Sequence, residues 1–452
     1  MTGMTEKKGI KLLTELLNIE GIKVISNRQH SGIGILLQVE SIEKERVCPR
    51  CGTKSRRLHQ NHRYLIKDLP WGETSVFLEI NRRQFKCSKC GKPFSEDLEF
   101  VGKRRTYTKR LANQILQEVI GKDIHSVAQK GVVTTEEIER MLKDASKELV
   151  KSRPSELKRL GIDEIALIKG KGNYCAVLID IDKSKLLEIR EGRTKEEIKE
   201  VLTSWGTEVL ESIEEVSIDM WKGYKNVVTE ILSKAQVVAD RFHVMAQINK
   251  ELDAQRKQQK RKVENLIKAA KSEKEKAEYE QVLEGLKKSK YVLLKNESDL
   301  NEEQKSKLMQ VKEVSPTLKL MHELKEKIHK IFEQTNNWLT GLFKLGIWLS
   351  RAKKYFPDSQ STIIRWLDEI IAYFDNRTTS GVVEGINNKL KLIKRSAYGF
   401  RNFDNYRIRC LLNWHLNCWF GIVSTEEPVK MNSGGQIFGL LIMLKFRNGG
   451  RW

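Results

Sequence analysis

The sequence predicts a multidomain protein in which zinc-ribbon and helix-turn-helix modules precede an α/β core interrupted by a helical insertion. Three observations lead to this prediction: two cysteine pairs near the start, a change from helical to strand-like periodicity near residue 160, and a long, purely helical stretch after the last strand. A chain of 452 residues also exceeds one ordinary hydrophobic core, so several domains are expected. The changes of pattern divide the chain into segments 1–100, 101–152, 153–246, 247–373, 374–425 and 426–452.

The chain carries a large excess of positive charge. Its 82 lysines and arginines against 60 acidic residues give a formal net charge of +22. A basic surface favours a polyanionic partner because it displaces the counterions of nucleic acid, although charge says nothing about sequence specificity. We therefore favour nucleic acid as the partner, the alternative being a protein with solvated lysine faces.

The N-terminus lacks the apolar stretch of a secretory signal, and no run reaches the roughly 20 apolar residues of a membrane span. We expect a cytoplasmic protein without membrane contact. Four of the seven cysteines form two CxxC pairs, which indicates metal ligation in a reducing compartment rather than a disulfide framework.

The first candidate site is this pair of motifs, CPRCG and CSKCG. Four thiolates complete the coordination of one zinc ion, and a glycine after each second cysteine lets the backbone fold back towards the sulfurs. We predict a structural Zn²⁺ site without an open position for catalysis, held by Cys48, Cys51, Cys87 and Cys90. His59 and His62 lie between the pairs, in a segment interpreted as a loop. They could compete as ligands, but we interpret them as surface residues near phosphate.

Residues 1–47 indicate a short helix followed by strand-like stretches, and three helical periods follow the cysteines. Gly121 and Gly131 mark turns, and Thr134 with Glu137 forms a capping box before the third helix. This spacing is typical of a helix-turn-helix, although any compact three-helix unit would give the same pattern.

The period becomes strand-like after the polar linker SRPSELKRLG. GIDEIALIKG, NYCAVLIDID and KLLEIREGR predict an antiparallel meander, with a turn at Lys183 and Ser184. A helix (TKEEIKEVLTSWGTEVLESI), a strand (EEVSIDM), a second helix and a strand (QVVAD) follow, so the order is β-β-β-α-β-α-β with one mixed sheet. In the helical insertion, three tryptophans are expected in the core: Trp338, Trp348 and Trp366.

The second candidate site combines three acids. Asp163 lies at the start of the first strand of the core, and Asp219 ends the strand EEVSID, where a carboxylate is costly unless charge compensates it. Glu384 lies one turn into a helix and shares a face with Asn388, Lys391 and Arg395. Three such carboxylates can hold two divalent cations roughly 4 Å apart, which activate a water or a 3′-hydroxyl and stabilise the departing oxygen of a phosphodiester.

Each acid alone would be interpreted as an N-cap or a surface group, so only their joint placement carries the hypothesis. Other acids near the first strand and before the last helix compete for the same role. They are Glu164, Asp180, Asp182, Asp368, Glu369 and Asp375.

These residues resemble the bacterial insertion-sequence transposases of the ISL-three family. The resemblance covers roughly residues 40–420 and is carried by the cysteine pairs, GIDEIA, VSIDMWKGY, VVADRFHV and VEGINNKLKLIKRSAYGFRNF. It implies a DDE catalytic domain of RNase H-like fold, with Asp163, Asp219 and Glu384 as catalytic residues. It also implies two Mg²⁺ ions, for which Mn²⁺ can substitute.

Basic residues near these acids are expected to contact the DNA backbone. Beside Glu384 the candidates are Lys391, Lys394, Arg395 and Arg401. Asp240 and His243 in ADRFH resemble the D-x2-H element of related transposases, so Arg241 and His243 are further candidates, with a structural histidine as the alternative. Trp221 could stack on a base, but we interpret it as a core residue.

The resulting hypothesis is a transposase that binds the terminal inverted repeats of its element, cleaves the 3′ ends and transfers them to target DNA. Synapsis of two ends implies a homodimer or higher oligomer on double-stranded DNA, associated with the nucleoid. A non-catalytic regulator, a decayed or domesticated copy, or a structure-specific nuclease are the alternatives. Segment 426–452 is interpreted as an irregular tail, resembling read-through sequence.

Overall fold

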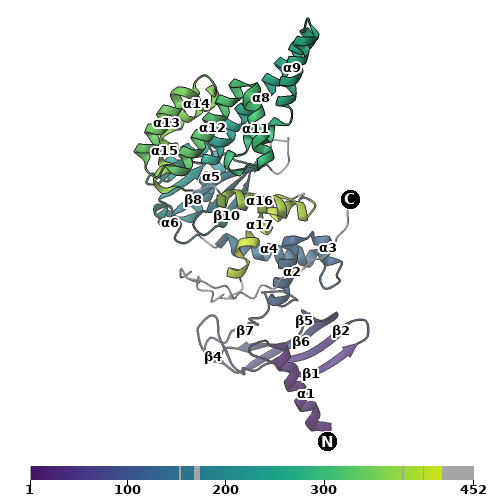
Figure 1. The fold of residues 1–452 in the computed structure, drawn as a ribbon. Helices are drawn as coiled ribbons and strands as arrows, with labels where there is room; N and C mark the ends of the chain where they lie inside the picture. Colours follow the sequence, from purple (N-terminus) through teal and green to yellow (C-terminus); the bar gives the residue numbers. More distant parts are fainter. Residues whose placement is uncertain (1, 152–153, 167–173, 379–380, 401, 420–452) are drawn as a thin grey trace, which may run out of the picture.

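The computed structural model describes residues 2–151, 154–166, 174–378, 381–400 and 402–419. Figure 1 shows four parts in a row: an N-terminal sheet with one helix, a small helical unit, an α/β sheet and a stack of helices. Arg401 and the segment 426–452 lie outside the described residues. Across the described ranges, no helix has the length and apolar character needed to cross a membrane.

The N-terminal part packs α1 (Thr2–Leu17) on a sheet of order β1-β2-β6-β5, with β7 paired to β6. Its core includes Leu17, Val39, Ile66 and Leu78, all buried. The strands are β1 (Ile22–His30), β2 (Gly34–Ser41), β5 (Leu58–Trp71), β6 (Thr74–Lys86) and β7 (Pro93–Ser95); a small hairpin joins β3 (Arg46–Val47) to β4 (Lys54–Ser55).

The interpretation of the segment between the cysteine pairs as a loop is wrong. It forms most of the long β5–β6 hairpin, and His59 and His62 are exposed residues of β5. The reason lies in β6, whose Val76 and Leu78 alternate into the core and pair with the second half of β5. The polar first half of β5 extends the same ladder without burying side chains.

The helical unit contains α2 (Lys109–Gly121), α3 (Ile124–Ala128) and α4 (Thr135–Lys151). The capping box is confirmed: the Thr134 amide donates to Glu137 Oε2 (3.0 Å), and the Glu137 amide donates to Thr134 Oγ1 (3.2 Å). The core of the unit includes Ile408 and Leu412 of α17 (Phe403–Trp419), near the end of the described chain. A distant helix therefore completes this small core.

The α/β sheet has the order β10-β9-β8-β11-β12, in which the first three strands are antiparallel and the last two are parallel to β8. The predicted mixed sheet, its antiparallel meander and the order of the strands along the chain are confirmed. Its elements are β8 (Arg159–Ala166), β9 (Tyr174–Asp180), β10 (Lys185–Glu191), α5 (Lys195–Trp205), α6 (Thr207–Ser212), β11 (Glu215–Ile218), α7 (Lys222–Ile231) and β12 (Gln236–Ala239). The helix predicted between β10 and β11 is broken into α5 and α6, because Gly206 adopts a φ of 89°.

The region after β12 is helical throughout, as predicted (Figure 1). Its helix α15 (Leu367–Asn376) contacts the edge strand β12, and its core is continuous with the one that α5 and α7 form on one face of the sheet. Trp348 and Trp366 are buried, but the prediction for Trp338 is wrong: it begins α13 on a face shared with the exposed Leu339 and remains 46% exposed. The helices are α8 (Arg241–Ala269), α9 (Glu273–Leu286), α10 (Ser289–Leu294), α11 (Glu302–Val314), α12 (Pro316–Gln334), α13 (Trp338–Ala352), α14 (Pro357–Arg365) and α15 (Leu367–Asn376), with a 3₁₀ turn, η1 (Glu297–Asp299).

The other face of the sheet is covered by α16 (Gly381–Ser396) and α17. Their buried residues, among them Ile386 and Leu390, share a core with Val177 of β9. The Arg407 guanidinium of α17 pairs with Glu188 of β10, with Nε 2.7 Å from Oε1. Helix α17 therefore ties the sheet to the helical unit.

Candidate active site and zinc site

The four predicted zinc ligands come together. In the described chain, Cys48, Cys51, Cys87 and Cys90 make up the one group of three or more His, Cys, Asp or Glu side chains whose ligand atoms all lie within 4.8 Å of one another. Two sulfur pairs lie 3.5 Å (Cys51–Cys87) and 3.8 Å (Cys48–Cys90) apart.

The local turns explain this geometry. The Gly52 amide donates to the Cys48 carbonyl (2.9 Å), the Gly91 amide donates to the Cys87 carbonyl (3.1 Å), and both glycines have positive φ. The donor set of four thiolates fits a structural Zn²⁺ ion and leaves no open position. His59 and His62 do not belong to the cluster.

Two of the three predicted acids lie side by side. Ile162 of β8 pairs with Ile218 of β11, and Ile218 pairs with Ala239 of β12. The next residue in each segment is acidic: Asp163, Asp219 and Asp240. Parallel neighbouring strands thus bring three carboxylates side by side as an acidic row, with Asp219 and Asp240 directly after β11 and β12. The prediction that Asp163 lies at the start of its strand is wrong, because β8 begins at Arg159 and Asp163 is an internal residue.

The carboxylate of Asp219 lies in surroundings that disfavour its charged form. Burial, followed by the charges of Glu164 and Asp163, raises the pKa of Asp219 to about 6, although His243 opposes the shift. The Nε2 atom of His243 lies 3.6 Å from both Asp163 Oδ1 and Asp240 Oδ2. Burial lowers the pKa of His243, but its interaction with Asp163 and the neighbouring negative charges outweigh burial, so its pKa is raised overall.

Glu384 lies on the neighbouring helix α16, exposed and without a hydrogen bond or ion pair to any described residue. The helix approaches β8 closely, since a Cβ on Gly161 would lie 3.1 Å from Val383 Cγ2. One turn after Glu384, the buried Asn387 donates from Nδ2 to Asp163 Oδ2 (2.6 Å). The structure therefore joins α16 to the acidic row through Asn387, while the oxygens of the three predicted acids do not all lie within 4.8 Å of one another.

Most of the competing acids have other surroundings. Asp182 pairs with Arg159 (2.6 Å), and Glu369 pairs with Lys225. Asp180 accepts the Lys183 amide in the β9–β10 turn, Asp375 accepts the Trp338 amide, and Asp368 is exposed on α15. Glu164 alone among the competitors lies beside Asp163 and influences Asp219.

Glu164 belongs to a cluster that the sequence did not indicate. The Arg193 guanidinium pairs with Glu164 (2.6 Å) and lies over the rings of Tyr174 (4.6 Å) and Trp221 (5.6 Å). Trp221 packs against the core, as we interpreted it, and its amide donates to Asp219 Oδ1 (3.2 Å). No signal in the sequence placed Arg193 here, whereas Asn387 could have been found one turn after Glu384 in the same motif.

The predicted DNA contacts divide into two groups. Lys391 and Arg395 are exposed on α16, and Lys394 is half-buried there. Arg241 instead pairs with Glu333 (2.5 Å), and His243 faces the acidic row, so the structure gives both residues intramolecular partners.

We expect Asp219→Asn to stabilise the protein in magnesium-free buffer. A folded-state pKa of about 6 lies above the ordinary value of about 3.9, so the folded protein binds more protons between these values and loses stability as pH rises through them. The substitution should raise the free energy of unfolding by about 1–2 kcal/mol at about pH 8, and by less at about pH 5. Urea unfolding of both proteins at the two pH values measures this; equal differences at both would contradict it.

We expect Asn387→Ala to lower DNA cleavage without weakening DNA binding. Removing the 2.6 Å hydrogen bond leaves the Asp163 carboxylate free to turn. The loss of such a supporting contact to a metal ligand typically lowers activity by about 10–100-fold. Asn376→Ala is the matched control, because Asn376 also donates from Nδ2 to a carboxylate, Glu215 Oε2 (2.7 Å), at the opposite end of β11 from Asp219. Cleavage rates that fall equally in both variants would rule out a specific role for Asn387.

Comparison with known proteins identifies the class of protein to which this chain belongs. A family model described as transposase, the DDE type of the ISL3 (ISL-three) group, matches residues 160–410, and a model for the zinc finger of the transposases of IS204, IS1001, IS1096 and IS1165 matches residues 44–90. The transposase for insertion sequence element IS1001 of Bordetella parapertussis is 25% identical over 402 residues, covering 86% of this chain and 94% of the relative. The transposase for IS1557 of Mycobacterium tuberculosis is 25% identical over 425 residues, covering 87% and 93%.

The fold and the match over the α/β sheet define a transposition enzyme of the insertion-sequence class. The chain belongs to the ISL3 family of DDE transposases. The zinc-finger match and the four-cysteine cluster together support a structural Zn²⁺ ion.

Proposed function

We propose that this transposase cleaves the 3′ ends of its own insertion sequence and transfers them to target DNA. The observation that carries the proposal is the placement of Asp163, within β8, beside Asp219, directly after the neighbouring parallel strand β11, with a helix tied to Asp163 by Asn387. Family membership supports the reaction class.

Asp163, Asp219 and Glu384 would hold two Mg²⁺ ions, with Mn²⁺ as a substitute. The acidic row fits cations, because Asp163 and Asp219 lie together there and burial, with the charges of Glu164 and Asp163, raises the pKa of Asp219. Glu384 is exposed and unpaired among the described residues, so its carboxylate is available as the third ligand. When bound, the metal activates a water or a 3′-hydroxyl and stabilises the departing oxygen.

The remaining residues would position DNA and the reacting groups. The exposed Lys391 and Arg395, with Lys394, would hold the backbone along α16, and Arg401 is a further candidate from the sequence. His243 would orient Asp163 rather than contact DNA, since it lies 3.6 Å from that carboxylate. Arg241 is proposed to hold the insertion against the core through Glu333.

The strand order 10-9-8-11-12, antiparallel and then parallel, favours an RNase H-like core. The zinc ribbon and the three-helix unit, in helix-turn-helix form, would bind the terminal inverted repeats, and synapsis of two ends would require at least a dimer. The division into segments 1–100, 101–152, 153–246, 247–373 and 374–425 remains our proposal for the domains.

The test is a labelled duplex carrying the end of the element, incubated with the protein and a target plasmid, with and without Mg²⁺. We expect Mg²⁺-dependent 3′-end cleavage and joining of the cleaved end to the plasmid. Cleavage without joining would favour a structure-specific nuclease, and binding without cleavage would favour a regulator or a decayed copy.

A further inference from the structure

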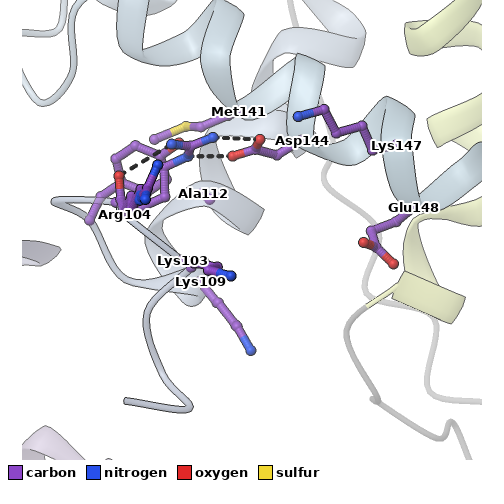
Figure 2. A pocket seen from close by; sticks show the side chains of 11 residues that line it. Lys103, Arg104, Lys109, Ala112, Met141, Asp144, Lys147 and Glu148 are labelled. Atoms are coloured by element: carbon purple, nitrogen blue, oxygen red, sulfur yellow. Dashed lines mark hydrogen bonds and ion pairs between the residues drawn. The ribbon is translucent and has the colours of Figure 1, made fainter. Parts of the chain in front are cut away.

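A basic concavity lies between helix α4 and the segment that follows the zinc ribbon. It is a cavity of about 850 Å³, seen in Figure 2, where Lys103, Lys109 and Lys147 surround the open space. Its lining includes two acidic residues, Asp144 and Glu148, and five basic residues: Lys103, Arg104, Arg105, Lys109 and Lys147.

The charge of this cavity is mostly uncompensated. The Arg105 guanidinium pairs with Asp144 through two contacts, Nε–Oδ2 at 2.5 Å and Nη2–Oδ1 at 2.7 Å, drawn as dashed lines in Figure 2. The other four cations are exposed and form no ion pair with any described residue. A cavity with this surplus of positive charge attracts an anion.

Tyr107 adds a hydrogen-bond donor to the lining. Its side chain is only 4% exposed, and its hydroxyl has no hydrogen-bond partner among the described residues. Burial, with the charge of Asp144, raises the pKa of Tyr107 to about 12, so the hydroxyl keeps its proton and can donate to an anionic oxygen. An unsatisfied buried hydroxyl is uncommon and indicates a missing partner.

Arg104 holds a strained backbone conformation at the rim. Its φ of 58° lies in the left-handed region, which glycine adopts without cost and an arginine does not. Strained backbone conformations of this kind concentrate at functional sites, where the function of the side chain outweighs the energetic cost of the backbone conformation. An exposed arginine at a position that glycine would occupy without strain agrees with a role for its side chain in binding an anion.

The cavity continues towards the zinc ribbon. A second cavity of about 1010 Å³ shares Gly102, Lys103 and Lys109 with the first and extends along the ribbon. The opposite end of α4 carries Glu136 and Glu139, which repel phosphate. An anionic polymer bound by both modules would therefore pass the C-terminal half of α4 and the ribbon.

We propose that this cavity binds backbone phosphates of the element-end duplex, positioning the zinc ribbon and the three-helix unit on one DNA molecule. The inference rests on the proposed function. It adds a phosphate site whose lining residues are separate from the basic stripe of α16 and from the acidic row.

The test is the double substitution Lys103→Gln/Lys147→Gln, compared with Lys8→Gln/Lys11→Gln on α1, which makes the same change of charge at exposed sites. Binding of a labelled element-end duplex and of an unrelated duplex is measured over a range of salt concentrations. We expect the cavity variant to bind the end duplex about tenfold or more weakly, with the slope of log affinity against log salt reduced by about 2. The α1 variant should bind as the wild type does.

Arg104→Gly separates binding from folding. Glycine relieves the left-handed strain, so the melting temperature should rise, yet removal of the guanidinium should weaken end binding. If the role of Arg104 were purely structural, the Arg104→Gly variant would be more stable than the wild type and would bind the end duplex equally well.

Two results would overturn the inference while leaving the proposed function intact: unchanged end binding by the double variant, or a loss confined to the unrelated duplex, which would assign the cavity to target DNA. Failure of the wild type to bind the end duplex at all would instead refute the proposed function.

Discussion

Glu384→Gln is expected to reduce Mg²⁺-dependent cleavage of the element end by about 10³-fold while end binding is unchanged. Glutamine keeps the size of the side chain but loses the charge that would hold a divalent cation, and the transition-state stabilisation supplied by such a cation is several kcal/mol. Glu384 is exposed and makes no contact that stabilises the described fold, so folding should be unaffected. Single-turnover cleavage of a labelled duplex measures the effect.

The matched control is Asp368→Asn. Asp368 is also exposed, lies on a nearby helix and competed with Glu384 in the sequence, so its substitution makes the same change of charge without touching the proposed site. We expect it to cleave at the wild-type rate. Equal cleavage by the wild type and the Glu384 variant would remove Glu384 from the proposed metal site, and would direct attention to Glu164 beside Asp163.

Cys87→Ala is expected to abolish stoichiometric zinc and to unfold the ribbon around the cysteine turns. Cys87 is 2% exposed and follows β6, the strand that pairs with β5, β2 and β7, so its loss removes a ligand and a core contact together. Structural zinc contributes apparent free energies of about 10–16 kcal/mol, far more than this small segment can replace by packing. Zinc content by atomic spectroscopy and hydrogen exchange of the β6–β7 amides measure both effects.

Cys175→Ala tests whether the effect is specific to zinc. Cys175 is also buried, on β9, but lies outside the cysteine cluster, and burial raises its pKa to about 12 so that it stays a thiol. We expect full zinc content in this variant. Zinc retained by the Cys87 variant would mean that another side chain, such as His59 or His62 on β5, can complete the site.

Some features were determined by the sequence alone, because their cause lies within a few residues. The cysteine turns need only two spacings and a glycine with positive φ after each pair, and all four thiols meet as predicted. The Thr134–Glu137 capping box is a contact within one helical turn, and the order of strands and helices along the core follows from local periodicity. The chain's departure from the prediction at Gly206 is equally local, since a glycine can leave the helix without cost.

Other features were decided only by tertiary structure, because they depend on segments far apart in the chain. The register that places Ile162 beside Ile218 brings Asp163 and Asp219 together, and no local pattern distinguishes these acids from Asp182 or Asp375. The polar half of β5 became a strand because β6 offered a ladder to pair with, and Asn387 reached Asp163 because α16 packs against Gly161. Strand pairing and helix docking depend on the apolar surface that is buried across the whole core. A local sequence pattern does not contain this information.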